Sequence, residues 1–246
     1  MRSVRPQPPA DVDPLAAEVL KRLQHHPEAR FVVLGGHFAL KCYFDYRPTH
    51  DLDGWWSRGL SGSQRSHARS VIRKVAGEVA TEQGLVIVER SWGDTEAIDF
   101  QRSTGDRPRT VFSIQIAERT VELEPPIISP WPPIPMETLR DNLASKMNAL
   151  VARGAPRDFR DVYQVVHAGL TTVKECWELW QAKNEGLEVN LAKAQVVKHL
   201  ESIALRRPLA QLTDRERAAA QSLRRWVLED LVNDIDLPGA RGRADS

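Results

Sequence analysis

Two aspartates separated by one residue, Asp51 and Asp53, are the side chains in this 246-residue chain that most clearly suggest chemistry. On a β-strand, residues i and i+2 point to the same face, so the two carboxylates would lie side by side while Leu52 faces the core. Adjacent carboxylates repel each other unless a cation lies between them. Mg²⁺ prefers oxygen ligands and commonly joins one or two carboxylates to substrate phosphates. The pair therefore predicts a Mg²⁺ site, which Mn²⁺ could also fill.

The segment before the aspartates could position phosphates. An apolar run over residues 31–34 predicts a short buried strand, and Gly35-Gly36 predicts a tight turn after it. Glycines let the backbone approach phosphates closely, and the N-terminus of a helix predicted over 37–46 favours anions. An isolated Gly-Gly is usually only a turn, and an isolated Asp-x-Asp is usually a solvated strand end. Their combination, in the order strand, turn, helix and carboxylate pair, predicts a site for a metal and a nucleotide.

The order of these residues resembles the first motif of the AbiEii/AbiGii toxin family, whose members have a polymerase-β-type nucleotidyltransferase fold and belong to type IV toxin–antitoxin systems. The family motif is Gly-Gly-x-Ala-Leu, a short helix, Arg-x-Thr or Arg-x-Ser, and then two aspartates around an apolar residue. The matching residues are Gly35-Gly36-His37-Phe38-Ala39-Leu40, Arg47-Pro48-Thr49 and Asp51-Leu52-Asp53.

A second match lies downstream, where the family carries Lys-x-x-Ala-Leu-x-x-Arg followed by Arg-Asp-x-x-Asp. The residues here are Lys146-Met147-Asn148-Ala149-Leu150-Val151-Ala152-Arg153 and Arg157-Asp158-Phe159-Arg160-Asp161. The resemblance extends over residues 31–166, which is more than half of the chain. Because two separated motifs occur in the right order, chance is a poor explanation of the resemblance.

The resemblance implies an active site made of Asp51, Asp53, Lys146 and Asp161, with the two aspartates of the first motif as the metal ligands. The residues implied to contact the nucleotide are Gly35, Gly36, His37, Arg47, Thr49, Arg157 and Asp158. A lysine ammonium can hold triphosphate oxygens as charge moves onto the leaving pyrophosphate. Asp161 could orient that lysine or the bound base. Without the family motifs, Lys146 would be a lysine beside an apolar helix stripe, and Asp161 a solvated aspartate.

The chain departs from the wider fold at the position where a later strand often carries a third carboxylate. Gln115, in the middle of Ile114-Gln115-Ile116, occupies this place. Glu122 is the nearest replacement, and Glu118 and Glu124 are weaker candidates. A neutral amide binds Mg²⁺ less strongly than a carboxylate does. Chemistry with one metal ion is therefore better supported here than chemistry with two.

Three arginines recur at every fourth residue near the start of a helix predicted over 67–83. Because Arg65, Arg69 and Arg73 are four residues apart, they share one helix face. One interpretation is an ordinary solvated face. The other is a weak RNA-binding stripe that contacts phosphates.

Composition excludes several classes of protein. The chain has 34 Lys and Arg against 33 Asp and Glu, so its net charge of +1 creates no global field toward nucleic acid or membrane. Cys42 and Cys176 are far apart and lack the spacing of a zinc site, which favours free thiols in a cytoplasmic protein. The chain has no apolar run of about 18 residues, so no membrane span is predicted.

The periodicity predicts an α/β (α+β) fold, in which a domain with a mixed sheet and helices is followed by an all-helical C-terminal domain. The resemblance implies that the first domain has the nucleotidyltransferase fold. The five prolines of 125–135 predict a stiff linker between them. The predicted parts are a flexible arm (1–14), the nucleotidyltransferase domain (15–124), the linker (125–135), the helical domain (136–237) and a disordered tail (238–246). The site is expected in the cleft between the two domains.

The predicted function is Mg²⁺-dependent transfer of a nucleotide from an NTP to RNA, with release of pyrophosphate. The resemblance implies the toxin of a toxin–antitoxin or phage-defence pair, a cognate antitoxin as partner, and the 3′ end of a tRNA as acceptor. One alternative is a transferase on the same fold that modifies a small molecule or a protein hydroxyl. The other is a non-catalytic NTP-binding or interaction protein, suggested by Gln115 and by His37, which stands where relatives tend to have a small hydroxyl residue.

Overall fold

The computed structural model describes residues 1–104, 107–119, 121–206 and 211–233. Contacts divide the chain into two compact units, each with its own hydrophobic core. The first unit is Val4–Asn142, and the second joins Met1–Ser3 to Leu143–Ser246. The predicted tail, 238–246, lies outside the described residues.

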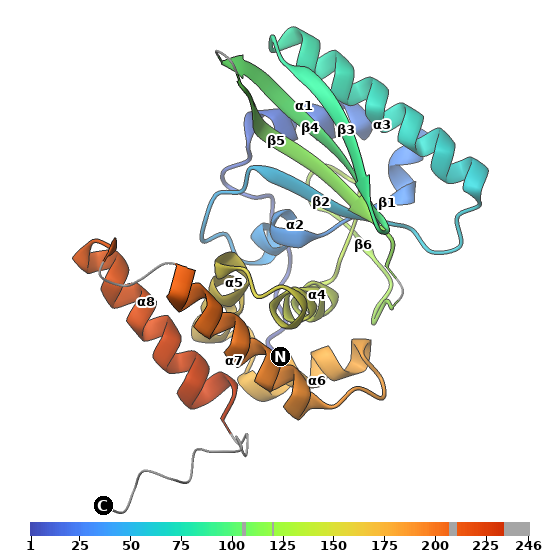
Figure 1. Ribbon diagram of the computed structural model, residues 1–246. Helices are drawn as coiled ribbons and strands as arrows, with labels where there is room; N and C mark the ends of the chain where they lie inside the picture. Colours follow the sequence, from blue (N-terminus) through green and yellow to red (C-terminus); the bar gives the residue numbers. More distant parts are fainter. Residues whose placement is uncertain (105–106, 120, 207–210, 234–246) are drawn as a thin grey trace, which may run out of the picture. The chain divides into compact units, whose positions relative to one another are not determined.

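A mixed sheet of seven strands, counted over the described residues, forms the centre of the first unit (Figure 1). Its strands are β1 (Val32–Leu34), β2 (Asp51–Trp56), β3 (Val86–Trp92), β4 (Thr95–Thr104), β5 (Arg107–Ala117), β6 (Ile127–Ile128) and β7 (Pro135–Met136). Their order across the sheet is β3-β4-β5-β2-β1-β7-β6. The strand with the two aspartates, β2, is central, parallel to β5 and antiparallel to β1.

Two helices supply the apolar core on one side of this sheet. They are α1 (Pro14–Leu23), which Asp13 caps, and α3 (Gly62–Glu82), which begins with a capping box of Ser61 and Gln64. Side chains of α3 such as Ile72 share one buried cluster with Leu52 of β2 and with alternate residues of β4 and β5. Since neighbours along a strand point to opposite faces, Asp51 and Asp53 lie on the other face of the sheet.

The proline-rich segment differs from its prediction as a linker. It contains β6 and leads into β7, which pairs with β1 through Leu34 and Met136. Ile134 and Met136 are fully buried in the core of the first unit, and the unit boundary falls after Asn142 instead. Proline excludes a helix but is tolerated at sheet edges and strand ends, so the segment can complete the sheet.

The N-terminal segment predicted as a flexible arm makes backbone contacts within the first unit. The N–H of Gln7 donates to the carbonyl of Cys42 at 2.7 Å, and the N–H of Ala10 donates to the Asp45 carboxylate at 3.1 Å. Both acceptors lie near the helix that follows the glycine turn. The segment is therefore held next to that helix.

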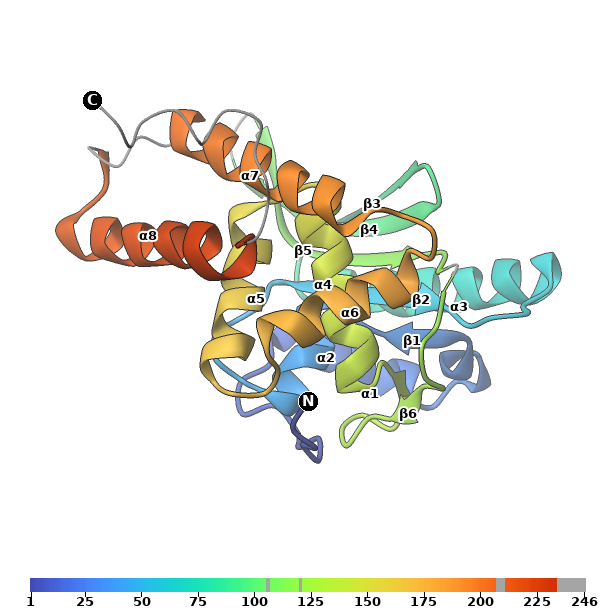
Figure 2. The same cartoon turned by 90° about the horizontal axis from the view of Figure 1, so that it is seen from below.

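The second unit is built from helices (Figure 2). Helix α4 (Leu139–Ala152) crosses the unit boundary and is followed by α5 (Pro156–His167), α6 (Val173–Lys183), α7 (Val189–Arg206) and α8 (Asp214–Trp226). Its core contains Phe159, Trp177 and Trp226. A mixed α/β unit followed by a helical one confirms the predicted fold class.

Both cysteines are free and buried, Cys42 in α2 (Gly36–Tyr43) and Cys176 in α6. Burial away from water disfavours the thiolate and raises the pKa of each thiol to about 12. The thiolate is the reactive form of cysteine. Each thiol should therefore be inert while its unit is folded.

This inertness can be measured with a thiol reagent at pH 8. With a pKa near 12, only about one thiol in 10⁴ is ionised, so the native protein should react more than about a thousandfold more slowly than the urea-unfolded protein. The unfolded protein is the control and should show two reactive thiols. Fast labelling of one thiol in the native protein would show that its unit opens readily.

Candidate functional site

The two aspartates of β2 lie as the sequence predicts. Asp51 and Asp53 are partly exposed, while Leu52 between them is buried on the α3 side. The hydroxyl of Thr49 donates a short hydrogen bond to the Asp51 carboxylate, and the backbone carbonyl of Asp53 accepts from the N–H of Gly35 at 2.9 Å. The carboxylates therefore share one face directly beside the glycine turn.

The glycine turn leaves no room for side chains. Gly36 has φ of +58°, and a Cβ there would lie 2.1 Å from Oδ2 of Asp53. A Cβ at Gly35 would lie 2.5 Å from Nε1 of Trp55. Because α2 begins at Gly36, its first turn starts against the Asp53 carboxylate. This arrangement brings a helix N-terminus, which attracts anions, next to the carboxylate pair.

The loop between α2 and β2 is fixed by two side chains of α2. Nζ of Lys41 donates to the carbonyl oxygen of Arg47 at 3.0 Å, and Nε2 of His37 lies 3.2 Å from the same oxygen. Lys41 also pairs with Asp45 at 2.7 Å, and its side chain is almost fully buried. His37 thus holds the loop that carries Arg47 and Thr49. The sequence analysis did not single out Lys41, because a lysine on a short helix is ordinarily solvated. Its place in the apolar run Phe38-Ala39-Leu40-Lys41-Cys42 was the available sign that it is buried.

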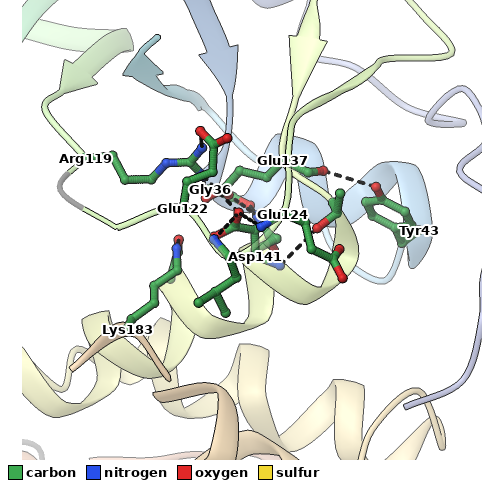
Figure 3. Close-up of polar contacts among 12 residues, drawn as sticks. Gly36, Tyr43, Arg119, Glu122, Glu124, Glu137, Asp141 and Lys183 are labelled. Atoms are coloured by element: carbon green, nitrogen blue, oxygen red, sulfur yellow. Dashed lines mark hydrogen bonds and ion pairs between the residues drawn. The ribbon is translucent and has the colours of Figure 1, made fainter. Parts of the chain in front are cut away.

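A second group of side chains braces the glycine turn from the start of α4 (Figure 3). The Asn142 amide donates to the carbonyl of Gly36 at 2.9 Å and to the Glu137 carboxylate at 2.8 Å. Arg119 donates to Glu137 at 3.1 Å and to Glu122 at 2.6 Å. Glu122, the predicted replacement for a third metal ligand, is therefore engaged by Arg119. Its place in this ion pair supports a bracing role.

A third carboxylate does lie on the aspartate face, at a residue that the sequence analysis did not consider. Gln115 of β5 stands opposite Asp53, and Ser113 stands opposite Asp51. One strand further, Asp99 is opposite Ser113 and accepts its hydroxyl at 2.9 Å and Nε of Arg90 at 2.6 Å. The Asp99 carboxylate raises the pKa of the Arg90 guanidinium by this hydrogen bond. The signal in the sequence was the alternation along this strand, which puts the Asp99 side chain on the same face as Ala97.

The donor set fits a single hydrated metal ion. Within the described residues, no cluster of three or more His, Cys, Asp or Glu side chains is arranged to hold a metal. Mg²⁺ commonly uses one or two carboxylates and completes its shell with water and substrate phosphates. Asp51 and Asp53 supply this number of carboxylates, and the glycine turn leaves backbone beside them for the phosphates.

The downstream motif forms a buried ion pair in the second unit. Nζ of Lys146 on α4 lies 2.6 Å from Oδ2 of Asp161 on α5, and both side chains are at least nine-tenths buried. This contact places the ammonium beside Asp161, while the roles of both residues in the reaction stay predictions. Asp158 caps α5 instead, since it accepts two hydrogen bonds from Arg153 and one from the N–H of Ala155. Arg157 is exposed in the first turn of α5.

The arginine stripe lies on α3, which covers the opposite face of the sheet from the aspartates. Each of its three side chains has an acidic partner: Arg65 pairs with Glu118, Arg69 with Glu96 at 2.7 Å and Arg73 with Glu89 at 2.6 Å. These pairs support the interpretation as a solvated face. The RNA-binding role of the stripe stays a prediction.

The first unit, with an Asp-x-Asp strand after a Gly-Gly turn in a mixed sheet, defines a nucleotidyltransferase fold. The family model described as nucleotidyl transferase AbiEii toxin, type IV toxin–antitoxin system, matches residues 18–229. The chain therefore belongs to this family of transferases, whose toxins act with an antitoxin. None of the curated proteins compared with the chain matches it. Over its described residues, no helix is long and apolar enough to cross a membrane.

The close contact at Gly36 predicts the effect of a single methyl group. Gly36→Ala must adopt a left-handed backbone, which costs about 1–2 kcal/mol, and must also displace the Asp53 carboxylate. We expect a lower melting temperature and loss of nucleotidyl transfer. Gly62→Ala, where an added Cβ meets no described atom within 4 Å, is the control and should behave as wild type. A fully active Gly36→Ala protein would contradict the close packing.

Proposed function

We propose that this protein transfers a nucleotide from an NTP to the 3′ end of an RNA, a tRNA, in a reaction that depends on Mg²⁺ or Mn²⁺. The observation that carries the proposal is the pair of carboxylates on β2 beside the backbone of Gly36. Family membership supports nucleotidyl transfer and an antitoxin partner. The tRNA acceptor comes from the resemblance of the two motifs.

The reaction joins the acceptor to the α-phosphate of the NTP. The acceptor hydroxyl loses its proton to solvent, its oxygen bonds to the α-phosphorus, and the bond from that phosphorus to the pyrophosphate oxygen breaks. A metal ion bound by Asp51 and Asp53 would neutralise charge on the triphosphate. Thr49 orients Asp51 through its hydroxyl, while the glycine turn and the first turn of α2 bind phosphate oxygens.

Lys146 supplies positive charge for the departing pyrophosphate. Its ammonium would bind oxygens of the β- and γ-phosphates, and the contact would strengthen as the pyrophosphate leaves. Asp161, 2.6 Å away and fully buried, keeps the ammonium in one position. Asp161 is therefore a positioning residue in this proposal, and Lys146 acts on the nucleotide.

Transfer to a protein or small-molecule hydroxyl is the second candidate. The stripe of Arg65, Arg69 and Arg73 had favoured RNA, and its three ion pairs weaken that argument. Incubation of the protein with labelled NTPs, Mg²⁺ and total tRNA separates the candidates. Label on RNA supports the proposal, whereas label on protein or a small molecule supports the second candidate. No transfer at all would indicate a non-catalytic NTP-binding protein.

The carboxylate pair can be tested by removing one ligand at a time. Asp51→Ala and Asp53→Ala should each abolish transfer, because one remaining carboxylate holds the metal and triphosphate poorly. Asp94→Ala, at an exposed aspartate of the β3–β4 turn, is the matched control and should remain active. Circular dichroism should show that all three proteins are folded. Near wild-type turnover of a soluble Asp51→Ala or Asp53→Ala protein would refute the metal assignment.

The Lys146–Asp161 pair requires a variant that separates folding from chemistry. Lys146→Met leaves a buried carboxylate without its partner and should cost about 3–5 kcal/mol of stability. Lys146→Met with Asp161→Leu replaces the pair by apolar side chains and should restore the melting temperature. Steady-state kinetics should show a large loss of kcat in the single and in the double variant. Lys146→Arg should restore kcat poorly, because a planar guanidinium does not replace a compact ammonium. An active double variant would exclude the catalytic role.

A further inference from the structure

The strand β3 carries an arginine beside an exposed tryptophan at one edge of the sheet (Figure 1). Arg90 and Trp92 are two residues apart, so they share one face of this strand. The guanidinium carbon of Arg90 lies 5.2 Å from the centre of the Trp92 ring. The Arg90 side chain is 52 % exposed and Trp92 is 46 % exposed. Tryptophan is highly buried on average, so an indole this exposed indicates a binding surface.

Strand register places this pair on the same face of the sheet as the two aspartates. Arg90 stands opposite Ala97 of β4. Ala97 stands opposite Gln115 of β5, which in turn stands opposite Asp53 of β2. Directly opposite residues of neighbouring strands point to the same face, and the register shift between β4 and β5 lies beyond these positions. With strands about 4.8 Å apart, three spacings put Arg90 roughly 14 Å from Asp53.

The orientation of the Arg90 guanidinium is fixed by Asp99. This buried carboxylate accepts Nε of Arg90 at 2.6 Å and the hydroxyl of Ser113 at 2.9 Å. Desolvation offsets the attraction in such a pair, so its main effect is to hold the arginine in one position. Because Asp99 binds Nε, the two Nη groups of this half-exposed side chain remain for a ligand.

We infer that Arg90 and Trp92 bind the single-stranded end of the RNA acceptor, the guanidinium at a phosphate and the indole at a base. The inference rests on the proposed function and assigns the acceptor a surface outside the carboxylate pair. Guanidinium groups donate paired N–H bonds to phosphate oxygens, and any base can stack on an aromatic ring. Stacking on a side chain requires an unpaired base. The acceptor therefore ends in an unpaired 3′ segment, which Trp92 meets a few nucleotides from the reacting hydroxyl.

A second copy of the chain is the other occupant to consider, because edge strands readily pair with one another. Val86 and Val88 are also exposed on this face of β3 and would add apolar contacts to such an interface. Strand addition relies on backbone groups, however, and gives the fixed guanidinium no role. The position of Arg90 on the carboxylate face and its donors for phosphate favour RNA.

The tryptophan is tested with two labelled RNA stem-loops, one with an unpaired 3′ end and one with a blunt end, by fluorescence anisotropy. Trp92→Ala should weaken binding of the first RNA roughly 5- to 150-fold, which corresponds to the loss of one base stack. It should leave binding of the blunt RNA unchanged. Trp92→Phe should restore most of the affinity, because it keeps an aromatic ring. Ile128→Ala, at an exposed residue of β6 on the opposite edge of the sheet, is the matched control.

The arginine is tested by the salt dependence of the same binding. Arg90→Gln should lower the slope of log K against log salt by roughly 0.7, the value for one phosphate contact on a single strand. Because this variant leaves Asp99 buried without its cationic partner, Arg90→Gln with Asp99→Asn is measured beside it. The double variant should melt at a higher temperature than the single one and show the same change in slope. Arg73→Gln, which breaks an ion pair with Glu89 on the opposite face, should keep the wild-type slope.

Kinetics connect the surface to the reaction. Arg90→Gln and Trp92→Ala should each raise KM for RNA and leave KM for NTP unchanged. Wild-type affinity and KM in both variants, while the wild type labels RNA, would overturn this inference and leave the proposed function intact. A wild-type dimer that Trp92→Ala converts to a monomer would assign β3 to contact between copies and would also overturn it. A wild type that labels no RNA would refute the proposed function, and the inference with it.

Discussion

At Gly36 the backbone approaches Asp53 so closely that a Cβ would lie 2.1 Å from a carboxylate oxygen. This approach requires both the left-handed backbone of Gly36 and the antiparallel pairing of Leu34 with Gly54. It also fixes where α2 begins, and so which backbone N–H groups face the carboxylate pair. The site therefore depends on the absence of a side chain at Gly36, and the surrounding elements act to keep this backbone in place.

The bracing around that turn uses buried charges. Lys41 holds the loop before β2 through the Arg47 carbonyl, and Glu137 with Arg119 holds the Asn142 amide that binds Gly36. Buried ion pairs contribute little net stability, because desolvation of the charges offsets their attraction. Their directional hydrogen bonds instead fix geometry. An aspartate pair that must bind a metal and a triphosphate needs that fixed geometry more than it needs extra stability.

Local patterns predicted much of this structure. The i, i+2 spacing placed Asp51 and Asp53 on one face, and apolar periodicity indicated α3, β5 and the helices of the second unit. Two-residue strands such as β6 have too few residues for periodicity, so the proline-rich segment was assigned to a linker. The partners of Asp99, and the acidic partners of the α3 arginines, come from pairings between separate segments. Strand register decides these contacts, and no local spacing encodes it.

The overall charge of +1 conceals two kinds of arginine. A regular stripe, such as that on α3, is conspicuous in a sequence, but glutamates of neighbouring strands neutralise it. Arg102 and Arg109 of the β4–β5 hairpin have no regular spacing and stand opposite each other only because β4 and β5 pair. Strand pairing thus decides whether arginines meet acidic partners or each other, and their spacing in the sequence does not.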